Sequence, residues 1–434
     1  MKPVFLRLAR ALGLLLVLLS AWVVWDNWGR GRVRLGTEPG VAAAAPSAAT
    51  LERGRDLLRA GNCVACHTRR GGEPLAGGRA IETPFGKVYS SNLTPDTTGL
   101  AQWSSEDFWQ ALHWGRSRGG RLLAPAFPYN HTSVITREDS DAMFHWLRSL
   151  APVQQAQPPH EIVWPLGSQP ALAVWRSLFF SPAPFQPDPR QSEQWNRGAY
   201  LVQGLGHCAA CHSPRNVFGA SGAVSDLGGG LMPVVNWYAP DLTYDAETGL
   251  ASTPVADTVR LLRTGVSAHA RTSGPMGEVV QHGLQHLGED DLTAMAVYLQ
   301  SRARSPDTKT ETPNAPARAV RGDVAQRGVK VYERHCVQCH GEQGRGVPGA
   351  YPALAGNRAV LLRDPTNLVQ VVLYGGYSPV TAGHPRPFGM PPGILELDDR
   401  DIAAVLTHLR TQWGHSAGEV TALQVNRIRA QQDE

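Results

Sequence analysis

Three copies of one short motif account for all six cysteines of this 434-residue chain. Each copy places two cysteines three positions apart, with a histidine directly after the second. The copies are Cys63-Val-Ala-Cys66-His67, Cys208-Ala-Ala-Cys211-His212 and Cys336-Val-Gln-Cys339-His340. On a helical turn this spacing puts both thiols on one face, with the imidazole following them. A motif that repeats three times and leaves no cysteine over indicates three similar units built around one chemistry.

The motif is typical of covalent attachment of c-type haem, in which the thiols form thioethers with the haem vinyl groups and the histidine binds the iron. Zinc is disfavoured, because three separated pairs, each with its own histidine, do not form a standard four-ligand set. A thioredoxin-like motif needs a βαβ context that the sequence lacks, and a disulfide framework does not require histidine after every pair. We therefore expect three covalently bound haem c groups with His67, His212 and His340 as proximal ligands.

The sequence around the motifs repeats as well. An Arg-Gly pair precedes the first cysteine by 10, 11 and 9 residues, at Arg53-Gly54, Arg197-Gly198 and Arg327-Gly328. Far downstream each copy has an acidic helix start followed by an apolar stripe, at Glu138-Asp139, Asp290-Asp291 and Asp398-Asp399. This period predicts a mainly α fold with three tandem copies of one helical haem domain after an N-terminal helix.

Segments rich in proline or polar residues separate the three copies. Residues 151–190 hold nine prolines and one short apolar stretch, and residues 303–318 are polar. The predicted order is an anchor at 1–30, a linker at 31–50, domain 1 at 51–150, a linker at 151–190, domain 2 at 191–302, a linker at 303–318 and domain 3 at 319–434.

The amino terminus carries an apolar run that predicts a targeting or membrane segment. Residues 11–25 are uncharged, three basic residues precede them, and the run ends in a tryptophan-rich stretch. A spanning helix needs about 20 residues, a length that is reached when residues 4–9 join the run. No small-x-small cleavage site follows closely, which favours an uncleaved anchor over a removed signal peptide.

Composition and motifs argue against other function classes. The chain has 41 basic and 37 acidic residues without basic runs, so nucleic-acid binding is not suggested. No flavin or nicotinamide fingerprint, Ser-His-Asp set or paired carboxylates stand out. We therefore name no catalytic residue and expect no substrate site on this chain.

Two methionines are predicted to be the second axial ligands of haems 2 and 3. Met276 lies in Gly274-Pro275-Met276-Gly277, and Met390 lies in Phe388-Gly389-Met390-Pro391-Pro392. Loops of this composition point a thioether inward without helical constraint, and methionine ligation raises the haem potential. The alternative for both is ordinary apolar packing.

The matching place in domain 1 holds Phe127, which cannot bind iron. His131 lies four residues further along the same loop and is the predicted distal ligand of haem 1. His113 and an open or water-bound position are the alternatives. Met143 aligns with Met295 on the terminal helix, so we predict that it fills the core. A haem with two histidines would have a lower potential than the His/Met haems, which predicts a downhill electron order starting at haem 1.

The proximal histidines are expected to donate their other ring nitrogen to a backbone carbonyl, which fixes the tautomer. For His340 a candidate carbonyl belongs to Pro352, 12 residues further on. A simple turn proline is the alternative for this position.

Over residues ~50–430 the chain resembles the tri-haem cytochrome c subunits of membrane-bound bacterial dehydrogenases. The resemblance rests on Arg197-Gly-Ala-Tyr-Leu-Val, Gly206-His-Cys-Ala-Ala-Cys-His-Ser-Pro-Arg215-Asn, Ala239-Pro-Asp-Leu-Thr243, Gly274-Pro-Met276, Gln285-His-Leu287, Leu354-Ala-Gly-Asn357 and Met390-Pro. It implies that the chain takes electrons from a separate catalytic subunit, with or without a small iron–sulfur or accessory subunit, and passes them to quinone or the respiratory chain. It also implies that the three helical haem domains are class I cytochrome c domains, and that the chain lies on the periplasmic side of the inner membrane.

The first domain departs from the alcohol and sugar-acid (gluconate) dehydrogenase branch, whose members carry methionine in the Pro-Ala-x-Pro-Tyr loop. The phenylalanine form, with Val88-Tyr-Ser-Ser-Asn-Leu-Thr-Pro95 and Arg121-Leu-Leu, resembles cytochromes that serve molybdenum hydroxylases acting on aldehydes, nicotinate or isoquinoline. The expected partner is therefore a molybdenum enzyme, with a flavin- or quinoprotein as the other choice. A c-type peroxidase with an open haem 1 is the alternative function, and a sensor is disfavoured because no signalling domain is present.

Overall fold

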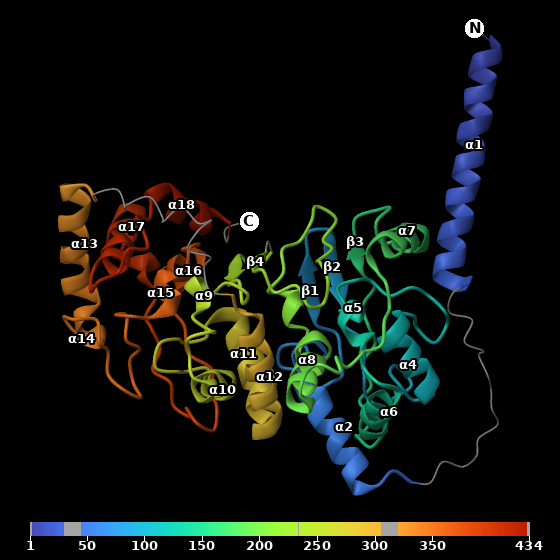
Figure 1. The fold of residues 1–434 in the computed structure, drawn as a ribbon, viewed down its shortest axis with the longest axis horizontal. Coiled ribbons are helices and arrows are strands. Elements are labelled where there is room, and N and C mark those ends of the chain that lie inside the picture. Colours follow the sequence, from blue (N-terminus) through green and yellow to red (C-terminus); the bar gives the residue numbers. More distant parts are fainter. Residues whose placement is uncertain (1, 30–44, 233, 305–319, 432–434) are drawn as a thin grey trace. The chain divides into compact units, whose positions relative to one another are not determined.

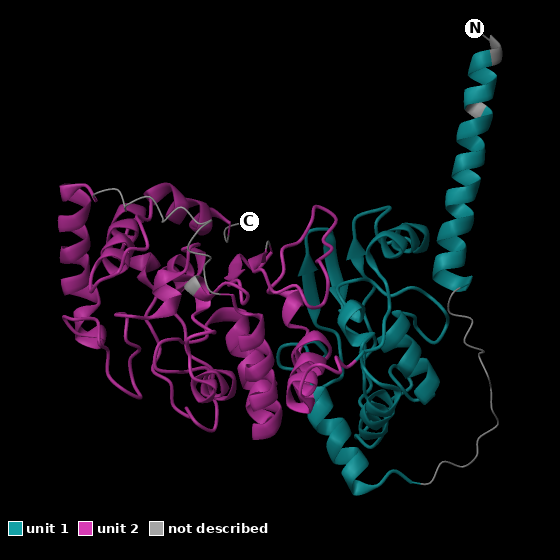
Figure 2. Ribbon diagram, in the orientation of Figure 1, with its two compact units in different colours: residues 1–58, 66–186 teal, residues 59–65, 187–434 magenta. Residues whose placement is uncertain are grey.

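The computed structural model describes residues 2–29, 45–232, 234–304 and 320–431. Most regular structure in these ranges is helical, which confirms the mainly α prediction (Figure 1). The chain forms two compact units, with residues 1–58 and 66–186 in unit 1 and residues 59–65 and 187–434 in unit 2 (Figure 2). The predicted linkers at 31–50 and 303–318 lie largely outside the described residues.

The first 186 residues combine helices with one small antiparallel sheet. In it β1 pairs with β2 from Ala80↔Tyr89 to Thr83↔Gly86, and β3 adds through Gly86↔Ile162. The elements in order are α1 Lys2–Val24, the π-helix η1 Trp25–Gly29, α2 Ala48–Ala60, α3 Cys63–Cys66, β1 Ala80–Thr83, β2 Gly86–Tyr89, α4 Ser105–Trp114, α5 Tyr129–Thr132, α6 Arg137–Arg148, β3 Glu161–Ile162 and α7 Gln169–Phe179.

The remaining residues hold the second and third copies of the motif within unit 2. The pair β4 and β5 is antiparallel, with Gly230↔Ala239 in register. The elements are α8 Glu193–Gln203, η2 Cys208–Ala210, β4 Gly230–Met232, β5 Trp237–Ala239, α9 Asp245–Thr248, α10 Val255–Thr264, α11 Gly274–His282, η3 Leu284–His286, α12 Glu289–Arg302, α13 Gly322–His335, α14 Val337–His340, α15 Arg358–Leu361, α16 Thr366–Tyr374, η4 Gly393–Leu395, α17 Asp399–Thr411 and α18 Ala422–Ala430.

The repeated glycines mark where the first and last helices of each domain cross. A Cβ atom on this glycine would lie within 2.4 Å of a backbone carbonyl oxygen of the facing helix in all three copies. The pairs are Gly54 with Ala142 (2.0 Å), Gly198 with Ala294 (2.0 Å) and Gly328 with Ala404 (2.4 Å). Only glycine permits so close an approach of two backbones, which explains why the residue recurs before each haem motif.

The repeated arginines pair with the acidic helix starts. Arg53 Nε lies 2.6 Å from Asp139 Oδ1, and Arg197 holds both oxygens of Asp291 at 2.8 Å. In domain 3 the Arg327 guanidinium lies 3.7 Å from Asp398 and 3.6 Å from Asp401. These ion pairs connect the helix before each motif to the N-terminus of the terminal helix. The repeated Arg-Gly pair and the repeated acidic helix start therefore stabilise the same helix crossing.

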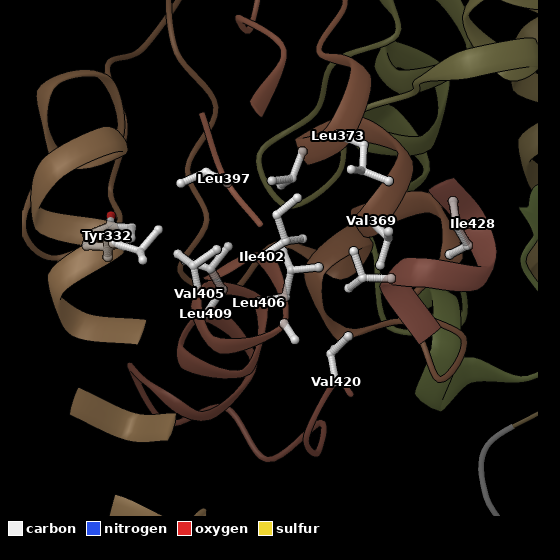
Figure 3. Packing of buried hydrophobic residues seen from close by; sticks show 14 of the residues in the cluster. Tyr332, Val369, Leu373, Leu397, Ile402, Val405, Leu406, Leu409, Val420 and Ile428 are labelled. Atoms are coloured by element: carbon white, nitrogen blue, oxygen red, sulfur yellow. The ribbon is translucent and has the colours of Figure 1, made fainter. Parts of the chain in front are cut away.

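The core of domain 3 shows how the crossing supports the haem turn. Figure 3 shows Tyr332 on α13, Val369 and Leu373 on α16, and Ile402 and Leu406 on α17 packed together. All five side chains are buried. Two partly buried residues of the predicted site, Cys336 and Met390, pack against the same cluster.

The amino-terminal helix is long and apolar enough to cross a bilayer. The apolar stretch covers residues 4–29 (26 residues), and none of the residues in its most apolar part is buried. Such a helix at this end of a chain is compatible with an anchor and with a signal sequence alike.

Candidate haem sites

Each cysteine–histidine motif forms one tight turn that ends at its histidine. α3 spans Cys63–Cys66 directly before His67. The amide of His212 donates to Cys208 O and the amide of His340 to Cys336 O, both at 2.9 Å. None of the six cysteines forms a disulfide. Paired cysteines in a turn directly before a histidine are the arrangement to which c-type haem attaches.

A backbone carbonyl orients the imidazole of each motif histidine. Nδ1 of His67 lies 2.8 Å from Ser91 O, and Nδ1 of His212 lies 2.8 Å from Pro240 O. For His340 the partner is Pro352 O at 2.9 Å, which confirms the sequence prediction. A ring that donates through Nδ1 presents Nε2 as its second nitrogen, the arrangement that metal-binding histidines use.

A second repeated contact fixes the backbone of the histidine itself. Its carbonyl oxygen accepts a hydrogen bond from a glycine amide in all three copies, at Gly77 (2.7 Å), Gly229 (2.8 Å) and Gly346 (2.8 Å). These glycines have φ of 77°, 71° and 63°. A side chain would be strained in this left-handed conformation and would also meet neighbouring backbone atoms at 2.4–2.6 Å.

The carbonyls that hold His67 and His212 come from the same kind of turn. Asn92 Oδ1 accepts from the amide and hydroxyl of Thr94, both at 2.8 Å. Asp241 Oδ1 accepts from the amide and hydroxyl of Thr243, both at 2.7 Å. The sequence alone did not identify these turns as the source of the orienting carbonyls. An alignment of Ser91-Asn-Leu-Thr94 with Pro240-Asp-Leu-Thr243 shows the shared pattern of an Asn or Asp two residues before Thr.

Burial sets the protonation of the site. It lowers the pKa of His67, His212 and His340, against the opposing effect of the carbonyl hydrogen bonds. These histidines are therefore neutral near pH 7, the form that binds iron. Burial, helped by the neighbouring cysteine, raises the pKa of Cys208 to about 12 and that of Cys336 to about 11. Because a thioether is uncharged, attachment suits these apolar surroundings.

The two candidate methionine ligands are held in different ways. Met276 lies in the first turn of α11 and not in a loop, since Pro275 fits the start of a helix. Met390 pairs with Gly376 through two backbone hydrogen bonds of 2.8 and 3.0 Å. Both side chains are half-buried. Met143 and Met295 are 1% and 2% exposed within the helical core, which confirms the core role predicted for Met143.

The candidates for haem 1 lie on two neighbouring helices of unit 1. His131 is on α5 and is 2% exposed, while His113 is on α4 and is 7% exposed. The Thr132 hydroxyl donates to Leu112 O at 2.6 Å, which ties α5 to α4. The ring of His113 stacks on Trp109 with centroids 4.5 Å apart. Phe127 precedes α5 and is half-buried.

These residues fit covalently bound haem. In the part of the chain that the structure describes, no three His, Cys, Asp or Glu side chains gather as a metal-binding group. Each motif instead offers paired thiols and one oriented imidazole, and the second and third copies also contain a half-buried methionine, which are donor types of a c-type haem.

Comparisons with known proteins agree with this geometry. The family model described as Cytochrome c matches residues 51–151 and 325–413. The gluconate 2-dehydrogenase cytochrome c subunit of Pantoea cypripedii is 39% identical over 88% of this chain and 90% of its own length. The cytochrome c subunit of the quinone alcohol dehydrogenase of Gluconacetobacter polyoxogenes is 37% identical over 88% of this chain and 84% of its own length.

A third relative is a longer protein, of which this chain matches one part. A nicotinate dehydrogenase subunit of Pseudomonas putida is 40% identical over 94% of this chain, which covers 33% of that protein's length. The long matches to the other two relatives and the repeated haem turn lead to one assignment. The chain belongs to the cytochrome c subunits of bacterial dehydrogenases.

Proposed function

We propose that this chain is a tri-haem electron-transfer subunit, which carries electrons from a catalytic dehydrogenase subunit to quinone or the respiratory chain. The observation that carries the proposal is the threefold recurrence of an imidazole held by a backbone carbonyl at 2.8–2.9 Å, directly after two paired cysteines. The relatives named for gluconate and alcohol dehydrogenases support the same role.

The residues have distinct tasks in this function. The six motif cysteines hold haem covalently, and His67, His212 and His340 bind iron through Nε2. Met276 and Met390 complete the coordination of haems 2 and 3. The haems supply reversible one-electron chemistry, and a methionine ligand raises the potential at which it occurs. The chain orients the imidazoles and surrounds the sites with apolar residues.

For haem 1 we assign His131 as the distal ligand. It is the more deeply buried of the two histidine candidates, and it follows the Phe127 position on the same segment. Two nitrogen ligands would give haem 1 the lowest potential of the three, so electrons entering there pass downhill to haems 2 and 3. The peroxidase alternative finds no support among the relatives, which are named as dehydrogenase subunits.

The proposed partner is a molybdenum hydroxylase. Phe127 in place of methionine supports this choice over a flavin- or quinoprotein partner, as does the relative named as a nicotinate dehydrogenase subunit. The proposed location is the periplasmic face of the bacterial inner membrane, with α1 as the anchor. An added iron–sulfur subunit belongs to this proposal only as a carrier between the catalytic centre and haem 1.

Haem stoichiometry and potentials test the function. In the full-length exported protein, the pyridine haemochrome assay should give three haems per chain that acidified acetone does not extract. A potentiometric titration should resolve a low-potential haem that the His131→Ala variant converts to a CO-binding form. The His145→Ala variant is the control, because His145 lies on α6 outside the predicted site. Fewer than three covalent haems, or haem 1 as the highest-potential centre, would contradict the proposal.

A further inference from the structure

Residues 163–186, which include α7, expose apolar side chains and carry no exposed charge of their own. Five large apolar side chains are exposed there: Val163 (63%), Trp164 (85%), Leu166 (45%), Val174 (48%) and Leu178 (61%). Arg176 is the only charged residue between Ile162 and Pro187. Its side chain is buried, so it brings no charge to this surface.

The helix α7 has apolar residues on two faces. Leu172, Ala173 and Arg176 face the interior of unit 1 and are buried. Val174 and Leu178, four positions apart, lie on another face and are exposed. A helix that packs its arginine inward and turns aliphatic side chains outward is built for apolar surroundings on its outer side, because water would favour the opposite arrangement.

The same helix is tied to the end of the amino-terminal span. Asn27 of η1 is 2% exposed, and its amide nitrogen donates to Ala173 O at 3.0 Å and to Ser177 Oγ at 2.9 Å. Arg176 Nε donates to Asn27 Oδ1 at 3.0 Å, and its Nη2 donates to Trp114 O at 2.7 Å. These contacts hold α7 beside the polar end of the span, and Figure 1 shows α7 and β3 on the side of unit 1 toward which α1 projects.

We infer that the patch formed by Val163, Trp164, Leu166, Val174 and Leu178 rests in the lipid interface of the membrane that α1 spans. This inference depends on the membrane location given under the proposed function. A lipid surface is favoured over a protein partner because Asn27, at the end of the span, is hydrogen-bonded to the helix α7 that carries part of the patch, and because Trp25 and Trp28 at the end of the span are exposed, as Trp164 is. Tryptophan is enriched where a bilayer meets water.

The patch gives the amino-terminal helix a second point of attachment. A single helix leaves a domain able to tilt and rotate about the point where the chain emerges. With α7 fixed to η1 and lying in the interface, unit 1 would present one constant face to the membrane. The span and the patch together therefore set the height and the orientation of domain 1.

Lipid photolabelling tests the inference on the full-length holoprotein. The chain is reconstituted in phosphatidylcholine vesicles that contain a phosphatidylcholine with a diazirine near the headgroup, and labelled peptides are located by mass spectrometry. We expect residues 163–178 to be labelled severalfold more than the peptide with Leu395, a matched control that is also 85% exposed but lies in unit 2. The double variant Trp164→Ser/Leu178→Gln should lose most labelling at Val163 and Val174 while its haem spectrum is unchanged.

Labelling of α1 distinguishes failure of the interfacial patch from failure of the proposed membrane location. If α1 is labelled and residues 163–178 are labelled no more than Leu395, the interfacial patch is overturned while the anchor stands. If α1 is unlabelled too, the membrane location itself is overturned, and the patch inference with it. An unlabelled patch in a chain that sediments as a dimer would assign the surface to a second copy and would also overturn the inference.

Discussion

Gly198 lies against the carbonyl of Ala294 so closely that a Cβ atom would come within 2.0 Å of the oxygen. This contact is the crossing of α8 and α12, and Arg197 beside it holds Asp291 with two hydrogen bonds of 2.8 Å. Domain 2 therefore has a steric and an electrostatic constraint at adjacent residues. The haem motif begins ten residues after Gly198, so the crossing sets where the haem turn starts.

The variant Gly198→Ala should destabilise domain 2. The added methyl group would overlap the carbonyl oxygen of Ala294, which belongs to the backbone and cannot move aside as a flexible side chain can. We expect a loss of about 2 kcal/mol or more in the free energy of unfolding, typical of overpacking. Guanidinium titration of the holoprotein, followed by tryptophan fluorescence that haem quenches, measures the loss. Gly322→Ala is the control, since a Cβ there meets no atom within 4 Å; equal stability of the two variants would contradict the crossing argument.

The variant Met276→Leu should leave haem 2 covalently bound but without its sixth ligand. Axial ligands set haem potentials over a range of about 0.8 V, so loss of the thioether should lower one of the potentials in a redox titration. The reduced protein should also gain one CO-binding haem in its visible spectrum. Met295→Leu serves as the control, because Met295 is 2% exposed in the core of the same domain. An unchanged titration in Met276→Leu would refute the assignment.

The variant Asn92→Ala should disturb haem 1 without touching a ligand. The Asn92 amide nitrogen donates to Val153 O at 2.7 Å, and its Oδ1 accepts from Thr94 N at 2.8 Å. Loss of these buried hydrogen bonds should cost about 3 kcal/mol. It should also release the carbonyl of Ser91 and shift the potential of haem 1.

Asn92→Asp separates the two effects of Asn92→Ala. Aspartate occupies the matching position 241 and keeps the acceptor oxygen. We expect this variant to lose the donation to Val153 while it retains the potential of the unmodified haem 1. If calorimetry shows reduced stability for both variants and the potential moves equally in both, the turn does not orient His67.

Asp398 should stabilise domain 3 in a pH-dependent way. Its carboxylate caps α17 by accepting from the Asp401 amide at 2.7 Å, and hydrogen bonds from Asp401 and Arg400 amides lower its pKa. The folded pKa lies below the unfolded value, so the stabilisation is present above about pH 4 and is lost as the pH falls through the folded pKa.

At pH 7 the variant Asp398→Ala should lose about 1 kcal/mol in the free energy of unfolding. The loss should disappear near pH 2, as measured by guanidinium titration at both pH values. Asp398→Asn retains a capping oxygen without the charge, so at pH 7 it should lose less stability than Asp398→Ala, and this difference from the parent should disappear near pH 2. A loss in Asp398→Ala that is independent of pH would show that the carboxylate charge has no part in the cap.

The haem turns were predictable because their chemistry is local. Cys208, Cys211 and His212 lie within five residues, and the Arg197-Gly198 pair recurs at a nearly constant distance before them. The contact of His340 with the carbonyl of Pro352 was predictable for the same reason, because the two residues are only 12 positions apart. Sequence alone therefore predicted the mainly α fold, and His67, His212 and His340 as proximal ligands remain a prediction.

Backbone contacts between residues far apart in the sequence could not be predicted, because they leave no recognisable motif in the sequence. Any residue can supply a carbonyl oxygen, so Ser91 and Pro240 became recognisable only once the turn residues Asn92 and Asp241 were compared. The prolines around α7 suggested a linker, and its contact with Asn27 joins residues nearly 150 positions apart. Met276 was expected in a loop because Gly-Pro usually interrupts a helix, whereas here Pro275 begins one.

The separation between each histidine and the carbonyl that orients it differs among the copies, at 24, 28 and 12 residues. In the first two copies the intervening chain includes a pair of antiparallel strands, β1 with β2 and β4 with β5, so its length can change while the histidine and the carbonyl keep their contact. Lengthening such a loop carries only a small entropic cost. The first two copies thus leave room for inserted surface elements between the histidine and its carbonyl, whereas the third holds the two within half that length of chain.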